Sequence, residues 1–149
     1  MAVTASGLFV ATFVDVLDTT QLALDLDLET HRGALFSNSV TPNFTTDTAY
    51  GVAPYNANEV TGTNWAAGGV LLTGTTFLAS SGTAVFDATD VSVASTTLTG
   101  ARCYMLYADA LAGNNAILLV DFQADYATVN GTFAITWAAG GIAILDLPP

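Results

Sequence analysis

Hydrophobic and polar residues alternate over short distances along most of this chain, and turn-forming residues separate the runs. Beyond residue 20, runs rich in Val, Ile, Thr and aromatic residues are divided by Gly, Asn, Asp and Ser, which is the pattern of short β-strands. Roughly eight to ten such strands with few helices predict a mainly β fold, an antiparallel β-sandwich or jelly roll. In the second half we expect strands at residues 69–73, 83–87, 91–94, 97–107, 116–122, 131–137 and 142–147.

The N-terminal segment, residues 1–20, has a different pattern. Phe9, Phe13 and Val16 recur at helical spacing, and Ser6 precedes them at a position suited to an N-cap. The β-branched residues of the segment favour a strand instead. We expect a short helix at about residues 6–18 that packs against or beside a sheet.

Residues 21–29 alternate strictly between apolar and polar positions. Leucines occupy positions 22, 24, 26 and 28, while Asp25, Asp27 and Glu29 share the opposite face. This pattern predicts a half-buried strand with an acidic face in water. A second short strand is expected at residues 32–36.

Residues 37–58 contain two prolines, a glycine and several asparagines, which predict a long loop with at most one edge strand. A loop of this length in a small domain is often an interaction surface. Turn sequences also occur at residues 80–83, 112–115 and 138–141. Asn130-Gly131 gives the strongest hairpin signal, because both residues tolerate positive φ.

Composition sets further limits. The 149 residues are enough for one compact domain, 1–149. Only 10% of them are charged, against roughly 25% in an ordinary soluble domain. Much of the surface must therefore be uncharged, which suggests that other subunits cover part of it and that the protein is a homo-oligomer.

The charge balance excludes two kinds of partner. The formal net charge is −11, there is no lysine, and the basic residues are Arg32 and Arg102. Nucleic acids and anionic membrane surfaces both bind through Lys and Arg, so we expect neither as a partner. Two long uncharged stretches, residues 60–86 and 126–145, are interrupted by Gly, Thr, Ser or Asn and do not have the pattern of membrane helices.

Little in the chain suggests catalysis. His31 is the single histidine, so any Ser-His-Asp or Cys-His arrangement would need it, and no serine elbow accompanies it. We expect a structural or surface role for His31 and a buried, inert thiol for Cys103. One His and one Cys are too few for zinc, and carboxylates on a single strand cannot surround a calcium ion. No catalytic, cofactor-binding or metal-binding residue is predicted, and the protein is not expected to be an enzyme.

Aromatic residues leave one binding alternative. Trp65 and Trp137, with Tyr50 and Tyr55, could stack on sugars. Aromatic residues in β-sandwiches more often belong to the core, so a carbohydrate-binding module is the less favoured reading.

Three stretches of the chain resemble a family of small structural proteins of tailed bacteriophages. They are NEVTGTNWAAGGVLLTG (58–74), VFDATDVSVASTTLTGARCYMLYAD (85–109) and ILLVDFQADYATVNGTFAITWAAGGIAIL (117–145), preceded by Thr41-Pro42-Asn43. The resemblance covers roughly residues 28–147 and rests on the order and spacing of these motifs.

The resemblance implies a β-sandwich subunit of the virion, without catalytic residues. The favoured role is a head decoration or cement protein, made in the host cytoplasm and bound to the outer surface of the capsid. Its partners would be the major capsid protein or other virion subunits. A trimer would suit the local three-fold points of the shell. A tail-associated subunit, such as a tail or fibre-base protein, is the alternative.

Six aromatic residues are the candidate contacts with other subunits. They lie in or beside the N-terminal segment and the 37–58 loop, and no strand partner is evident for them from the sequence. They are Phe9, Phe13, Phe36, Phe44, Tyr50 and Tyr55.

Overall fold

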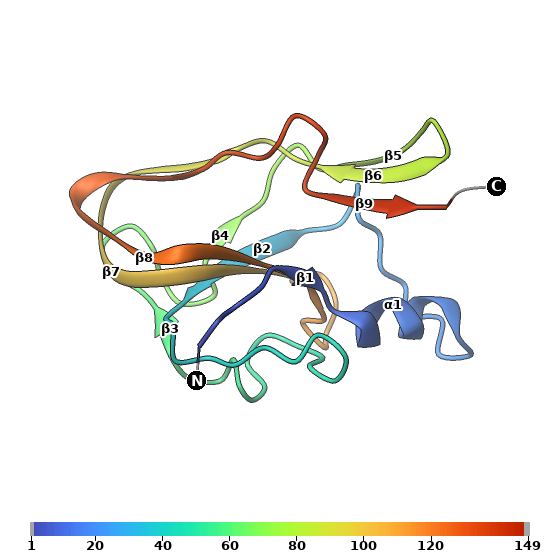
Figure 1. Ribbon diagram of the computed structural model, residues 1–149, viewed down its shortest axis with the longest axis horizontal. Helices are drawn as coiled ribbons and strands as arrows, with labels where there is room; N and C mark the ends of the chain where they lie inside the picture. Colours follow the sequence, from blue (N-terminus) through green and yellow to red (C-terminus); the bar gives the residue numbers. More distant parts are fainter. Residues whose placement is uncertain (1, 148–149) are drawn as a thin grey trace.

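The computed structural model describes residues 2–147, which form two antiparallel sheets and one short helix in a sandwich-like arrangement (Figure 1). The predicted mainly β fold with an N-terminal helix is confirmed. The larger sheet has the order β1-β8-β7-β2-β3, with β4 also paired to β2, and the smaller has the order β5-β6-β9. The elements are β1 (Gly7–Leu8), α1 (Val10–Leu17), β2 (His31–Phe36), β3 (Glu59–Val60), β4 (Val70–Leu71), β5 (Thr76–Ser80), β6 (Thr83–Asp87), β7 (Val91–Ala108), β8 (Ala116–Ile135) and β9 (Ala143–Asp146).

Strands β7 and β8 form one long hairpin that takes part in both layers. The hairpin begins in the larger sheet beside β2, bends at the left of Figure 1 and continues in the upper layer towards β6 and β9. Several register shifts interrupt the pairing between Val93 and Cys103. Such bulges bend a strand pair and increase its twist, which allows one hairpin to serve two layers.

The prediction of a hairpin turn at Asn130-Gly131 is wrong. Gly131 lies inside β8 opposite Thr96, and the positive φ of Asn130 (47°) belongs to a bulge in the hairpin. Positive φ suits a two-residue turn and a bulge equally well, so the local sequence does not distinguish them. The expected strands at 91–94 and 97–107 are consequently one strand, as are those at 116–122 and 131–137. The chain reverses instead in the segment 109–115, as the turn sequence at 112–115 predicted.

The larger sheet is buried on both faces where β2 pairs with the end of β7 and where that end pairs with the start of β8. Along β7, Tyr104 and Leu106 point into the core between the two layers, whereas Cys103 and Met105 point into a second core on the opposite face. The loop of residues 37–58 and the N-terminal segment cover this second core. Because both faces are buried there, residues 103–108 of β7 form a nearly continuous apolar run rather than an alternation.

Residues 21–29 do not form the predicted strand. The carboxylate of Asp25 accepts hydrogen bonds from the backbone N–H groups of Asp27 (3.2 Å) and Leu28 (3.1 Å), which closes a turn. Asp side chains compete in this way with strand pairing. Leu26 reaches the core, but Leu28 is 83% exposed, so the four leucines do not share one buried face.

The N-terminal helix is confirmed, but Ser6 does not cap it. The residue before the first turn is Phe9, which makes no side-chain cap. The Ser6 hydroxyl accepts instead from the N–H of Asp121 (2.8 Å), and the buried Thr12 hydroxyl donates to the carbonyl of Ala116 (2.6 Å). These two bonds attach the N-terminal segment to β8.

The remaining short strands were predicted from the sequence only in part. The strand at 83–87 has the predicted bounds, and the positive φ values of Ser81 and Gly82 form the tight turn before it. The short strands β1 and β3 and the five-residue β5 were not predicted. Within residues 2–147, no helix is long and apolar enough to cross a membrane.

Gly33 offers a test of the contact between β2 and β7. A Cβ atom at Gly33 would overlap the ring of Tyr104, which lies across this position. We expect Gly33→Ala to lower the free energy of unfolding by about 1–3 kcal/mol, the usual range for overpacking a core, as measured by urea denaturation. Gly140→Ala is the control, because no atom lies within 4 Å of a Cβ there. Equal stability of the two variants would contradict this packing.

Candidate interaction surface

Three of the six candidate contact residues are buried inside the subunit. Phe9 and Phe36 have no exposed surface, and Tyr55 is 2% exposed. The ring centroid of Tyr55 lies 5.8 Å from that of Phe9 and 5.4 Å from that of Phe36, both in edge-to-face geometry. In this structure these three side chains therefore pack within the subunit and not at its surface. Their partner is the second face of the larger sheet, which the sequence did not show to be buried.

Phe44 and Tyr50 are half-buried at the margin of the same core. The ring of Phe44 lies 5.3 Å from Phe9, and Tyr50 stacks on Tyr107 at 4.4 Å. The Tyr50 hydroxyl donates to Glu59 (2.8 Å). Burial, together with this bonded carboxylate, raises the pKa of Tyr50 to about 12. Both side chains are thus engaged within the subunit, and Phe13 alone of the six borders a groove.

Helix α1 presents an apolar stripe to the surroundings. Val10 is 47% exposed, Val14 52% and Leu17 85%, and their i, i+4, i+7 spacing places them on one face. The opposite side of the helix packs on the protein through Phe13 and Thr12. A surface helix normally has a polar outer face, so these three exposed apolar side chains make this face of α1 unusual.

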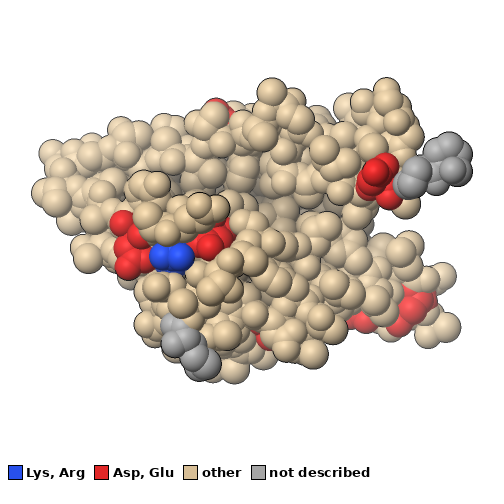
Figure 2. All heavy atoms as spheres, in the orientation of Figure 1, with Lys and Arg blue, Asp and Glu red and all other residues tan. Residues whose placement is uncertain are grey.

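A groove lies beside this helix. We call it the α1 groove; its volume is about 580 Å³. In Figure 1, α1 lies below the end of the smaller sheet on the right, and the outline of Figure 2 is notched on the same side. Its apolar walls come from α1, from the segment 23–29 and from β5 and β9. The lining residues are Phe13, Val16, Leu17, Ala23, Leu24, Asp25, Leu26, Asp27, Glu29, Phe77 and Leu145.

One wall of the α1 groove is acidic. Asp25, Asp27 and Glu29 all belong to the turn segment. A hydrogen bond between the Asp25 and Asp27 side chains lowers the pKa of Asp25 and raises that of Asp27. Within the described residues, no three His, Cys, Asp or Glu side chains are grouped to hold a metal ion.

His31 lies buried under this acidic turn. Its Nε2 is 3.0 Å from the carbonyl of Asp25. A carbonyl can only accept, so Nε2 carries the proton and Nδ1, which is buried without a partner, does not. Burial lowers the pKa of His31. The imidazole therefore attaches the turn segment to β2, a structural role.

The buried position of Cys103 is confirmed. The thiol has no exposed surface, and Sγ lies 3.9 Å from the carbonyl of Phe36. Burial raises the pKa of the Cys103 thiol to about 12. The reactive thiolate is therefore scarce at neutral pH.

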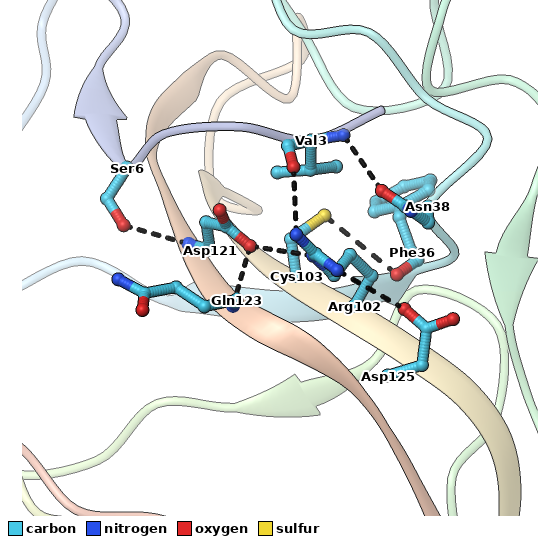
Figure 3. Close-up of polar contacts among 9 residues, drawn as sticks. All are labelled: Val3, Ser6, Phe36, Asn38, Arg102, Cys103, Asp121, Gln123 and Asp125. Atoms are coloured by element: carbon cyan, nitrogen blue, oxygen red, sulfur yellow. Dashed lines mark hydrogen bonds and ion pairs between the residues drawn. The ribbon is translucent and has the colours of Figure 1, made fainter. Parts of the chain in front are cut away.

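Both arginines are neutralised by aspartates of the same chain. Arg32 lies 3.3 Å from Asp109, and Arg102 lies 2.9 Å from Asp121 and 3.7 Å from Asp125. Figure 3 shows that Arg102 also donates to the carbonyl of Val3 (3.2 Å), which attaches the N-terminal segment to β7. In Figure 2 the few charged atoms are separated by wide uncharged areas. The surface therefore presents no unpaired arginine.

A second hollow, of about 640 Å³, lies along β8. Its aromatic lining includes Phe122, Tyr126, Phe133 and Trp137, while its polar side chains, apart from the tyrosine hydroxyl, are hydroxyls of Ser and Thr. Trp137 donates from its indole N–H to the carbonyl of Thr89 (3.2 Å). This lining lacks the carboxylate and amide side chains that would bond several sugar hydroxyls at once.

Trp65 cannot serve as a platform for sugar stacking. Its side chain has no exposed surface and packs against Phe133 at 5.4 Å between ring centroids. The expectation that aromatic residues in a sandwich belong to the core is confirmed at this position.

No family model, curated protein or solved structure matches this chain. The apolar stripe on α1 and the adjoining α1 groove are the most distinctive features of the described surface.

His31 makes stability depend on pH. Below pH 6.5 the unfolded chain protonates His31, whereas the folded protein does so only at its lowered pKa. The free energy of unfolding should therefore fall as the pH decreases through 6.5 and level off below the folded pKa. We expect His31→Gln, measured by urea denaturation at a series of pH values, to remove this slope. An unchanged slope in the variant would assign the dependence to other groups.

Cys103 should react with thiol reagents only after unfolding. Its burial and raised pKa predict that Ellman's reagent finds no reactive thiol in the native protein at neutral pH. One thiol per chain should react in concentrated guanidinium chloride. Rapid reaction of the native protein would show that the second core opens readily.

Proposed function

We propose that this protein is a non-enzymatic structural subunit of a tailed-bacteriophage virion, a decoration or cement protein on the outer surface of the capsid. The observation that carries the proposal is the exposed apolar stripe on α1 beside an apolar groove. The resemblance of residues 28–147 to small virion proteins supports the same assignment. The shell subunit, the major capsid protein, would be the principal partner.

The stripe can supply the free energy that a cement protein needs. Fully burying a Val or Leu side chain contributes about 1.5–3 kcal/mol, and Val10, Val14 and Leu17 are each about half exposed or more. A subunit that binds the assembled shell and not the separated subunits stabilises the assembly. Many copies on one shell would add their contributions.

The charge distribution supports an outer rather than an inner location. With a formal net charge of −11 and both arginines in ion pairs, the protein offers no counter-charge to packaged DNA. The wide uncharged areas of the surface also favour contact between copies, because contact there buries no charge (Figure 2). A trimer at the local three-fold positions of the shell is the assembly that we favour.

Removal of the protein from virions tests the proposed function. Particles that lack the protein should lose surface projections in electron micrographs and should release their DNA at a lower temperature. Purified wild-type protein, added back, should restore both properties. Particles of unchanged heat stability would contradict a cement role.

The number of copies per virion distinguishes a decoration protein of the head from a tail-associated subunit. A decoration protein should be present in roughly hundreds of copies per virion, as the symmetry of a shell requires, whereas a tail or fibre-base subunit would be present in far fewer. Quantitative mass spectrometry of purified virions, with the major capsid protein as the internal standard, measures this number. A low count would favour the tail-associated alternative.

A further inference from the structure

We propose that the α1 groove binds an apolar peptide segment that carries lysine or arginine and that the shell subunit supplies this segment. That the segment comes from the shell subunit rests on the proposed function. That it is apolar and basic rests on the residues that line the groove.

The walls of the groove require an apolar occupant. The apolar lining comes from α1, β5, β9 and the turn segment, through Phe13, Leu17, Phe77, Leu145, Leu24 and Leu26. Leu17 is 85% exposed and continues the stripe of Val10 and Val14 to the groove, and such a contiguous apolar patch marks an interaction site. An extended or helical segment with apolar anchors is the kind of ligand that such grooves accept.

The acidic wall requires a cationic occupant. Asp25, Asp27 and Glu29 line the same hollow, and the lining contains no basic residue to neutralise them. An anionic or purely apolar segment that occupied the groove would remove these carboxylates from water without supplying a counter-charge. Burial of an unpaired charge is costly. A lysine or arginine beside the apolar anchors would provide that counter-charge.

Charge complementarity argues against a second copy as the occupant. The chain has no lysine, and Arg32 and Arg102 are both held by aspartates of their own subunit. A copy would have to use an arginine whose charge its own aspartates already balance. A different protein with basic residues is therefore the better partner for this groove.

A pair of matched peptides tests the chemistry of the groove. Both peptides carry leucines at i, i+3, i+4 and i+7, with lysines between them in one peptide and glutamates in the other. We expect the wild-type protein to bind the lysine peptide at least about tenfold more tightly in fluorescence anisotropy, a ratio equivalent to about 1.4 kcal/mol. Equal binding of the two peptides, or no binding of the lysine peptide, would overturn the proposal.

Variants assign the binding to the groove. Leu17→Ser and Asp27→Asn should each weaken binding of the lysine peptide severalfold, and added salt should weaken the wild type more than Asp27→Asn. The matched controls are Leu78→Ser, at a 63% exposed leucine outside the groove, and Asp125→Asn, at an aspartate near Arg102. Both controls should bind as the wild type does. Circular dichroism checks that each variant is folded, and equal losses in controls and groove variants would refute the assignment.

Particles that lack the protein separate this inference from the proposed function. If the wild type binds them and Leu17→Ser does not, both are supported. If both proteins bind equally, the groove is not the contact and the inference fails alone. If the wild type binds no particles but still selects the lysine peptide, the proposed function and the shell as source are refuted. Self-association of the wild type in sedimentation that Leu17→Ser abolishes would assign the groove to a second copy and overturn the inference.

Discussion

The pairing of β7 with β8 is the interaction on which the rest of this structure depends. The hairpin supplies alternate side chains to two separate cores, with Tyr104 and Leu106 on one face and Cys103 and Met105 on the other. Bulges along the hairpin bend it, so that its two ends lie in different layers (Figure 1). A regular, flat pair of this length could not do so, because curvature in a sheet has to be introduced by bulges or glycines.

The bent hairpin also sets the walls of the α1 groove. The start of β8 holds the N-terminal segment, through the pairing of Gly7 with Leu119 and the bond from Thr12 to Ala116. The end of β8 leads into β9, which pairs with β6 and provides the opposite wall through Leu145. The two walls of the groove, α1 and β9, are therefore attached to opposite ends of the same strand, β8.

The chain has few charged groups, and many of them form ion pairs or hydrogen bonds within the subunit. Both arginines are held by aspartates, and several carboxylates accept hydrogen bonds from backbone or tyrosine donors, as Asp47 does from Asn43 and Tyr55. Charge-assisted bonds of this kind stabilise turns in a chain with little regular structure between residues 37 and 58. In the acidic wall of the groove, Asp25 and Glu29 likewise accept backbone hydrogen bonds, but no arginine lines the groove beside them.

The sequence by itself determined the fold class, the short N-terminal helix, the strand at 83–87, the long loop and the buried thiol, because each depends on local periodicity, turn chemistry or residue type. It did not determine the role of Asn130, since positive φ serves turns and bulges alike. Nor did it show that Phe9, Phe36 and Tyr55 are buried, because a pattern marks a residue as apolar without identifying what covers it. The α1 groove was decided only by tertiary structure, since its walls come from segments more than a hundred residues apart that meet through the bend of β7 and β8.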